Sequence, residues 1–395
     1  MKELPFRSAY LPYPQGSPFE VEPVNRRQSL VILGTGVLLA RDPPPPQPWV
    51  RVRLFSHIPQ LDQVILTAPL TLAGKTVAHG SWRLRAEEGS LWVESLTHDH
   101  SPRRYGQSLF VEQAQGIQVQ VQSPARRYRG RLEISITAAN QLAIHNYLPL
   151  EAYLYGVVPS EMPPEWPTAA LEAQAIVART HALSHHQQGD PTPLLDSTAQ
   201  QFYGGLTYER PTTTRAVQAT SGQLLTFSSH PQPIQALYHS TCGGHTSANQ
   251  TIFAPPARPY LQGIPCEWCQ PSPFYGPHTI HLAQADIQRI FGEREVHVLE
   301  QDPHGRPTQI AVGSRRLTGQ AFWLQLGQDL GWGVLPSNRY DWQPVEQGYR
   351  VTYRGAGHGV GLCQWGAYGQ AQAGRSAAQI LSSYYPQTHL GSLPF

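Results

Sequence analysis

Hydrophobic and polar residues alternate with a period of two in short segments between Trp49 and Thr137. Such alternation is typical of strands that have one buried face and one exposed face. Because Gly, Pro and polar turn residues separate the segments, we predict an all-β sandwich or barrel-like unit at residues 49–147. The predicted strands are WVRVRLF (49–55), VILT (64–67), SWRLR (81–85), LWVES (91–95), SLFVE (108–112), IQVQVQ (117–122) and RLEISIT (131–137).

A helical pattern begins at Thr168, where apolar residues recur on one face. We predict a helix that starts at Pro167 and Thr168 and stops at Gly189. Its apolar face consists mainly of alanine, so we expect another element to pack very close to it. Further helices are predicted at 317–327 and 376–386, and strands at 224–227, 233–241 and 349–355. The predicted fold class is therefore α+β, with a β-rich N-terminal unit and a mixed α+β unit at 148–395.

Residues 1–48 are predicted to form a tail outside these units. Residues 26–41 combine a basic start with an apolar run, which has the length and flanks of the hydrophobic part of a signal peptide. The run is shorter than the about 20 residues that a comfortable membrane span needs. A buried strand is the alternative. The proline-rich stretch RDPPPPQPW follows and is expected to be an extended linker. This arrangement predicts export to the periplasm or cell envelope, with the protein either released or anchored in the membrane near residues 26–41.

Composition narrows the class of protein. Hydrophobic residues make up 40% of the chain, which indicates a globular protein rather than a disordered one. The 37 prolines and 34 glycines favour short strands and many turns. Lys and Arg together number 29 and Asp and Glu number 27, so the formal net charge is +2. This near balance gives no indication of a nucleic-acid partner.

Three blocks of sequence, in a fixed order, carry a resemblance to a known family. They are LPLEAYLYGVVPSEMPPEWPTAALEAQAIVARTHAL (148–183), DSTAQQFYGG (196–205) with YHSTCGGHT (238–246), and GAGHGVGLCQWGAYGQAQAG (355–374). Together they resemble the signature of the SpoIID/LytB (stage-II sporulation protein D) family. The resemblance extends from Leu148 to Pro386, and three matching blocks are far more specific than one.

The resemblance implies an enzyme, because characterised members of that family are lytic transglycosylases. They cleave peptidoglycan glycan strands, best when the strands lack stem peptides, and leave 1,6-anhydro ends. One branch is described instead as enhancing a cell-wall amidase. The expected partners are therefore peptidoglycan glycan strands and, in the alternative, a cell-wall amidase that a non-catalytic wall-binding protein would assist.

Glu161 occupies the position of the family's catalytic glutamate in the PSEMP sequence. Glycoside cleavage needs a carboxylic acid that protonates the leaving oxygen, and a lytic transglycosylase can use one residue as acid and then as base. The neighbours of Glu161 are apolar, so we expect desolvation to raise its pKa and keep it protonated. The alternative is that Glu161 caps a turn or pairs with an arginine.

Six further residues are expected to bind substrate at the cleft. The resemblance places Arg179 in the cleft, where its paired N–H donors can hold sugar hydroxyls or a carboxylate. An ion pair with Glu172 or Glu209 is the alternative. Gln174 lies on the same helix, and His239, Ser240, His358 and Gln364 lie in the two glycine-rich blocks. We expect these two blocks to meet at the cleft floor, since glycines allow close approach. A buried structural histidine is the alternative for either His239 or His358.

The four cysteines of the chain lie in its second half, and two of them form a CxxC pair: Cys242, Cys266, Cys269 and Cys363. If the blocks converge, four thiolates can form one structural zinc site. His239 or His245 can replace one thiolate. The family's own zinc position, near the DST block, has no Cys or His here, so the resemblance does not imply this site. Two disulfides are the alternative in an exported chain. No cofactor is expected to be required for the chemistry itself.

Overall fold

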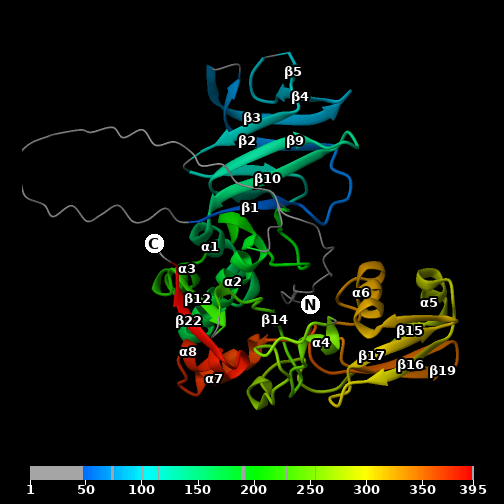
Figure 1. The fold of residues 1–395 in the computed structure, drawn as a ribbon. Coiled ribbons are helices and arrows are strands. Elements are labelled where there is room, and N and C mark those ends of the chain that lie inside the picture. Colours follow the sequence, from blue (N-terminus) through cyan, green and yellow to red (C-terminus); the bar gives the residue numbers. More distant parts are fainter. Residues whose placement is uncertain are drawn as a thin grey trace, which may run out of the picture.

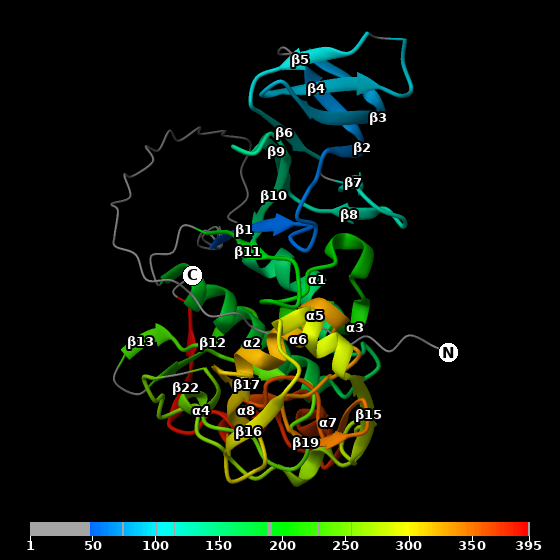
Figure 2. The same cartoon turned by 90° about the vertical axis from the view of Figure 1, so that its right-hand side faces the viewer.

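The computed structural model describes residues 48–393, apart from 73–74, 100, 114, 188–191, 228–229 and 254. The predicted signal or anchor segment at 26–41 lies outside the described residues. Among the described helices, none is both long enough and apolar enough to span a bilayer. The predicted α+β class is confirmed: Figures 1 and 2 show two sheets at one end of the molecule, helices beneath them, and a further mixed unit beside the helices.

The N-terminal unit contains two mainly antiparallel sheets, and β11, a strand from the later part of the chain, pairs in parallel with β1 at the edge of one of them. The five-stranded sheet has the order β11-β1-β10-β9-β6, and the six-stranded sheet has the order β5-β4-β3-β2-β7-β8. Each of the seven predicted segments contains a strand. The strands are β1 (Trp49–Leu54), β2 (Gln63–Leu72), β3 (Lys75–Glu87), β4 (Ser90–Ser95), β5 (Arg103–Tyr105), β6 (Ser108–Glu112), β7 (Ile117–Gln120), β8 (Arg126–Tyr128), β9 (Arg131–Ile136), β10 (Leu142–Pro149) and β11 (Leu194–Leu195).

The alternating pattern of the strands predicts their buried faces correctly. In β1, Val50, Val52 and Leu54 point into the core, and the residues between them are partly or fully exposed. The sequence analysis missed β10, the central strand between β1 and β9. Residues 142–146 of β10 are all buried, so this strand lacks the alternation that marks a half-exposed strand.

Three helices follow the sheets: α1 (Leu150–Glu161), α2 (Thr168–Gln187) and α3 (Pro211–Ala219). The prediction of α2 is confirmed, and its predicted stop, Gly189, lies outside the described residues. The alanine-rich face also packs closely, because Ala175, Ala178 and Ala182 belong to the same hydrophobic core as the strands and α1. The other side of α2 contributes to a second core. The hydrophobic core is therefore continuous across the predicted boundary between residues 147 and 148.

The second core lies on the far side of α2. Its elements are β12 (Gln223–Phe227), β13 (His230–Pro233), β14 (Tyr238–His239), β21 (Leu362–Cys363), α7 (Gln364–Gln372), α8 (Ala377–Tyr384) and β22 (Thr388–Ser392). The short strands β14 and β21 pair in parallel, with Tyr238 opposite Leu362 and His239 opposite Cys363. The predicted helix at 376–386 is confirmed as α8, and Ser376 forms a capping box with Gln379 at its start. Two short helices, α4 (Asn249–Ile252) and η2 (Glu267–Cys269), complete this region, whereas η1 (Gly205–Tyr208) packs against α1 and β8.

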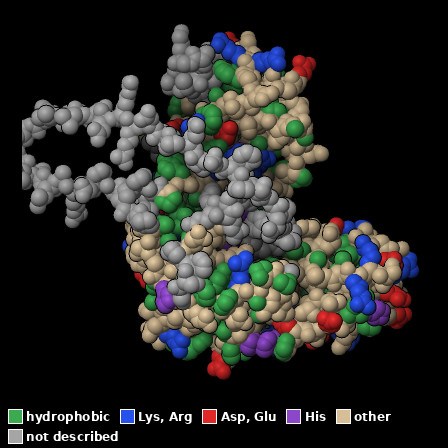
Figure 3. Space-filling model, viewed as in Figure 1, with side chains coloured by type: hydrophobic (Ala, Val, Ile, Leu, Met, Phe, Trp, Pro, Cys, Tyr) green, Lys and Arg blue, Asp and Glu red, His purple; other side chains and the backbone are tan. Residues whose placement is uncertain are grey.

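A third unit is inserted between β14 and β21 and has a hydrophobic core of its own. Its elements are β15 (His278–Ala283), α5 (Gln284–Phe291), β16 (Val296–Gln301), β17 (Pro307–Val312), β18 (Arg315–Thr318), α6 (Gly319–Leu330), β19 (Tyr340–Val345) and β20 (Gly348–Tyr353). The predicted helix at 317–327 is confirmed as α6. Figure 3 shows basic and acidic side chains mixed at the outer end of this unit, so that end is not a patch of a single charge.

Candidate active site

Glu161 is the last residue of α1, a helix that the sequence analysis did not predict. Gly156, Val157, Val158 and Pro159 all have low helix propensity, and proline has the lowest, so the local sequence gives little indication of this helix. Burial against the sheets and α2 stabilises α1, since most of its residues lie in the core. The helix ends where Met162 turns to an extended conformation and leaves the Glu161 side chain half-buried at the end of α1.

Segments from all three sequence blocks meet at Glu161. Its Oε1 atom accepts a hydrogen bond of 2.8 Å from the backbone N–H of Phe202, in the DST block. Gln364, the first residue of α7, donates through Nε2 to the Glu161 carbonyl oxygen at 3.1 Å. The same Nε2 atom lies 3.4 Å from Oε1 of Gln174 on α2. The Tyr238 hydroxyl also hydrogen-bonds the Glu161 side chain. The expected convergence of the blocks is therefore present, with Glu161 at its centre.

Burial raises the pKa of the Glu161 carboxyl from 4.5 to about 8. Hydrogen bonds from the Phe202 amide, the Tyr238 hydroxyl and Gln364 act in the opposite direction, because they stabilise the charged form. They do not outweigh desolvation. The position at the C-terminal end of α1 adds to the effect, since the negative end of a helix dipole disfavours a carboxylate. Among the described ion pairs, none includes Glu161. The site therefore presents a protonated carboxyl group at neutral pH.

An aromatic cluster follows Glu161 and Gln364 in the chain and includes a residue of the loop after α1 and two residues of α7. Trp166 lies between α1 and α2, and its ring centroid is 4.9 Å from that of Trp365 and 5.0 Å from that of Tyr368. All three rings are partly exposed, so they offer apolar faces at the surface. The sequence analysis did not select Trp166. The available signal was its position five residues after Glu161, together with Trp365 directly after Gln364.

The structure corrects the prediction that Arg179 lines a cleft. Arg179 is fully buried, and its Nε and Nη2 atoms each donate to one carboxylate oxygen of Glu151 at 2.7 Å. The carbonyl oxygens of Gln223 and Val217 accept further bonds from Nη1 and Nη2. These bonds join α1, α2, α3 and β12, so Arg179 forms an internal ion pair. Its partner is neither Glu172 nor Glu209, the two acids considered from the sequence, and Glu209 pairs with Arg129 instead.

The two histidines predicted to bind substrate are also buried. His239 and His358 have no exposed surface, and their ring centroids are 5.5 Å apart. Nδ1 of His239 contacts the Val360 carbonyl oxygen, and Nδ1 of His358 accepts a bond from the Val360 N–H, both at 3.1 Å. Burial lowers the pKa of His358 to about 3, so this ring is neutral. Both His239 and His358 are therefore buried, hydrogen-bonded histidines, which was the alternative to substrate binding.

Gln174 and Ser240 complete the predicted set. Gln174 is fully buried, and its Nε2 atom has no hydrogen-bond partner among the described residues. The Oε1 atom of the same Gln174 side chain contacts Gln364, which bonds Glu161. The unpaired Nε2 donor of Gln174 therefore lies close to the candidate site. Ser240 is partly exposed, and its carbonyl oxygen accepts a bond from the N–H of Trp365. Ser240 thus supports the aromatic cluster through its backbone.

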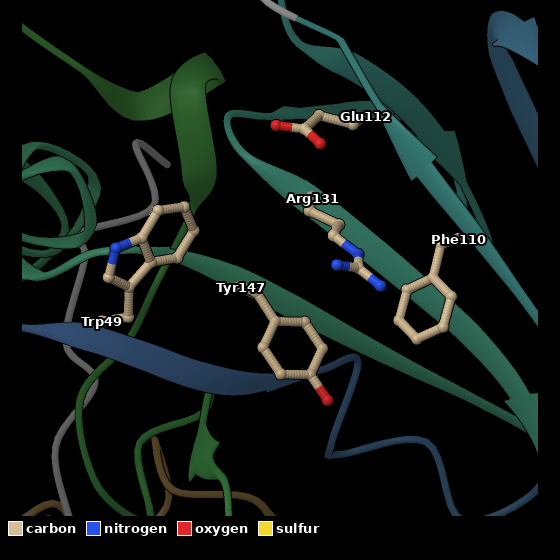
Figure 4. A pocket seen from close by; sticks show the side chains of 5 residues that line it. All are labelled: Trp49, Phe110, Glu112, Arg131 and Tyr147. Carbon is tan, nitrogen blue, oxygen red and sulfur yellow. The ribbon is translucent and has the colours of Figure 1, made fainter. Parts of the chain in front are cut away.

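A pocket of about 320 Å³ lies elsewhere, on the open face of the five-stranded sheet. Its lining residues are Trp49, Phe110, Glu112, Arg131 and Tyr147, and Figure 4 shows them together on this face. Trp49 and Phe110 are 60% and 44% exposed, which is high for such large apolar side chains. The Arg131 guanidinium lies over the Phe110 ring at 3.8 Å. The pocket combines aromatic faces with a basic and an acidic group.

The chain is similar over much of its length to stage II sporulation proteins and to an amidase enhancer. Residues 138–227 match the family described as "SpoIID: Stage II sporulation protein". Stage II sporulation protein D of Bacillus subtilis is 32% identical over 275 residues, 64% of this chain and 76% of that protein. An uncharacterized protein of Brachyspira hyodysenteriae is also 32% identical, over 62% of this chain and 67% of that protein. The amidase enhancer of Bacillus subtilis is 27% identical over 60% of this chain, but the match covers 40% of that longer protein.

Proposed function

The chain belongs to the SpoIID family, and from this premise we propose that it is a lytic transglycosylase acting on peptidoglycan. The family, together with the likeness to an amidase enhancer, supports a function related to the cell wall. The finer proposal is cleavage of the MurNAc–GlcNAc bonds of glycan strands, with peptide-free strands as the preferred substrate. The observation that carries it is the half-buried carboxyl of Glu161, which is protonated at neutral pH and lies where the three sequence blocks meet.

The proposed reaction uses one carboxyl group twice. Protonated Glu161 donates its proton to the glycosidic oxygen, and the electron pair of the broken C1–O bond stays on that oxygen. The sugar's own C6 hydroxyl then attacks C1, and its proton passes to the Glu161 carboxylate. The products are a 1,6-anhydro end and a free hydroxyl on the leaving sugar, and Glu161 regains its proton. A pKa near the working pH suits a group that must both give and take a proton.

Substrate is proposed to lie along the partly exposed rings of Trp166, Trp365 and Tyr368. Aromatic rings offer large, rigid apolar faces, and sugar rings carry apolar C–H faces that can pack on them. The Phe202 amide and Tyr238 hydrogen-bond the carboxyl group, and Gln364 holds the Glu161 backbone carbonyl, so the orientation of the carboxyl does not depend on bound glycan. Peptidoglycan lies outside the cytoplasmic membrane, so we also propose that the protein acts in the periplasm or cell envelope.

The decisive experiment is mass spectrometry of the products released from purified, peptide-free glycan strands. Wild type is expected to give anhydro-muramyl ends, and Glu161→Gln is expected to lose at least about 1,000-fold in rate, since general acid–base catalysis contributes on this scale. Glu165→Gln is the matched control, because Glu165 lies in the loop directly after Glu161 but is exposed. Reducing ends instead of anhydro ends would indicate a hydrolase. Full activity of Glu161→Gln would exclude Glu161 as the acid.

A second candidate function is a wall-binding protein that assists a partner amidase. Two observations favour it: the likeness to an amidase enhancer and the exposed aromatic pocket on the five-stranded sheet. In this case wild type would release no products from peptide-free or intact wall, yet it would sediment with wall material. Addition of a purified cell-wall amidase would then produce more peptide release with the protein than without it. The absence of both binding and stimulation would exclude this candidate.

A further inference from the structure

The four cysteines of the chain form one buried cluster. Cys242, Cys266, Cys269 and Cys363 have essentially no exposed surface, and their sulfur atoms all lie within 4.8 Å of one another. They come from three separate places: the turn after β14, the short helix η2, and the end of β21. Folding has therefore collected every thiol of the protein at one point, although residues 242 and 363 are far apart in the chain.

The spacing of the sulfur atoms fits one metal ion better than two disulfides. A tetrahedral zinc site with Zn–S bonds of about 2.3 Å places its sulfurs about 3.8 Å apart. The Cys242 and Cys269 sulfurs are 3.5 Å apart, whereas a disulfide needs about 2.0 Å. All four residues are free cysteines. Four soft thiolate ligands in this arrangement are typical of a structural zinc centre.

The surroundings of the sulfurs supply the hydrogen bonds that thiolate ligands require. The backbone N–H groups of Cys242 and Gly366 each donate to the Cys363 sulfur at 3.3 Å. The Tyr384 hydroxyl lies 3.1 Å from the Cys266 sulfur. A Cβ atom at Gly366 would lie 2.7 Å from the Cys266 sulfur and 1.9 Å from the Tyr384 oxygen, so only glycine fits there. Such outer contacts orient metal ligands and partly neutralise their charge.

A buried cation next to the cluster supports a negatively charged centre. Arg306 is fully buried, and none of the ion pairs in the described part of the chain includes it. Its Nη2 atom donates to the Cys242 carbonyl oxygen at 3.1 Å, and its Nε atom donates to Asn338. A buried charge is costly unless an opposite charge lies near it. The Asp302 carboxylate, which accepts a bond from the Arg306 backbone N–H at 2.8 Å, is one such charge. One Zn²⁺ with four thiolates carries a net charge of −2 and would supply another.

We propose that Cys242, Cys266, Cys269 and Cys363 bind one structural zinc ion that fixes both ends of the inserted unit to the core. Cys269 lies just before this unit and Cys363 just after it. Four protein ligands fill a tetrahedral site, so the metal has no open position for water and takes no chemical step. Zinc binding does not depend on the proposed reaction. The effect of zinc on catalysis does rest on the proposed function. Cys363 caps α7 directly before Gln364, so a metal bound to Cys363 would position the residue that bonds Glu161.

Metal analysis of the purified protein tests the site without any measurement of activity. We expect one zinc per chain in wild type, and less than a tenth of that in Cys242→Ser and Cys363→Ser. His245→Ala is the matched control: it lies beside the cluster but contacts Thr246 and His304, so zinc content should not change. Metal-free wild type without titratable thiols after denaturation would demonstrate two disulfides and overturn the proposal. Loss of zinc in His245→Ala would overturn the four-thiolate ligand set.

Two measurements on wild type keep the proposal testable if the serine variants do not fold. Cobalt-substituted protein should show the intense thiolate-to-metal charge-transfer absorption of a four-thiolate site, and its absence would contradict the ligand set. Hydrogen exchange should rise at 238–242 and 362–366 after zinc removal, and remain unchanged at 131–136 in the distant sheet. Equal exchange with and without zinc would exclude the clamping role even if anhydro products are formed.

Discussion

The pKa of Glu161 is set by residues that pack around it in the folded chain, including Phe202, Tyr238 and Gln364, and not only by the apolar residues next to it in the sequence. Desolvation is the largest effect on its pKa, and three hydrogen bonds oppose it without cancelling it. The pKa of about 8 in the folded protein lies above the ordinary 4.5, so the folded state retains a proton that the unfolded chain releases between these values. The stability contributed by this proton is complete below about pH 4.5 and is lost as the pH rises through about 8.

The pH dependence of cleavage should report this carboxyl. Because the first step needs protonated Glu161, we expect kcat/KM to fall as the pH rises through about 8. Tyr238→Phe removes a hydrogen bond that stabilises the carboxylate, so the alkaline limb should move upward by up to about one pH unit. The measurement is the rate of anhydro-end formation from peptide-free glycan across pH 5–10, with Glu165→Gln as control. An unchanged limb in Tyr238→Phe would show that this bond does not tune Glu161.

Arg179 and Glu151 should affect stability rather than catalysis. Arg179→Met leaves the buried Glu151 carboxylate without its partner, so we expect the free energy of unfolding to fall by about 3–5 kcal/mol. The double variant Arg179→Met/Glu151→Leu should recover most of this loss, because it removes both charges. Urea denaturation provides the measurement. Near-native stability with abolished cleavage in Arg179→Met would instead favour the original prediction that Arg179 binds substrate.

At the scale of elements, two of the parts that were not predicted, β10 and α1, are buried on several sides, whereas others such as α3 and α5 are partly exposed. Strand β10 and helix α1 follow each other in the chain and form the centre of the first core. Neither shows a clear period, because a fully buried element has no polar face. The half-exposed strands and α8, which carry alternation or caps, were predicted correctly. The period of hydrophobic residues marks elements that have one exposed face, and it does not reveal elements such as β10 and α1 that are buried on several sides.

The five-stranded sheet also has a face that its own unit does not cover. Strand pairing sets Tyr147 opposite Arg131 and Arg131 opposite Glu112, so these side chains form a row across β10, β9 and β6. We expect Trp49→Ala and Phe110→Ala to reduce sedimentation with purified wall by about 5-fold each, since each removes an exposed aromatic face. Cleavage of short soluble glycans should not change. Leu299→Ala is the control, because Leu299 is 43% exposed in the inserted unit. Equal sedimentation of all three variants would exclude this face from wall binding.

Over the whole molecule, sequence blocks identify the segments that meet but not the direction of each side chain. Matching to the family selected Glu161 and Gln364, and the Gln364 side chain donates to the Glu161 carbonyl oxygen in the structure. The same matching selected Arg179, His239 and His358 for substrate contact, yet all three are buried. A residue can be part of a motif because it packs or forms hydrogen bonds beneath the site, without contacting substrate. Burial depends on long-range packing, which a linear motif does not contain.

The continuous core predicts that the two main units depend on each other for folding. Tyr153 on α1 and Ala178 on α2 share a core with strands of the N-terminal unit, and β11 pairs with β1. A fragment of residues 148–395 would expose this surface, so we expect it to aggregate or to lack a cooperative thermal transition. A fragment of residues 48–395 retains both sheets and should unfold cooperatively. Circular dichroism with heating provides the measurement, and a cooperative transition in the shorter fragment would contradict the shared core.

The position of the cysteines also has an evolutionary consequence. The chain leaves the core after Cys269, builds the unit at residues 278–353, and returns at Cys363, with the two sulfurs less than 5 Å apart. A segment whose two ends lie close together can change in length and content without altering the path of the rest of the chain. The inserted unit can therefore change in length or sequence while the path of the chain around Glu161 stays the same.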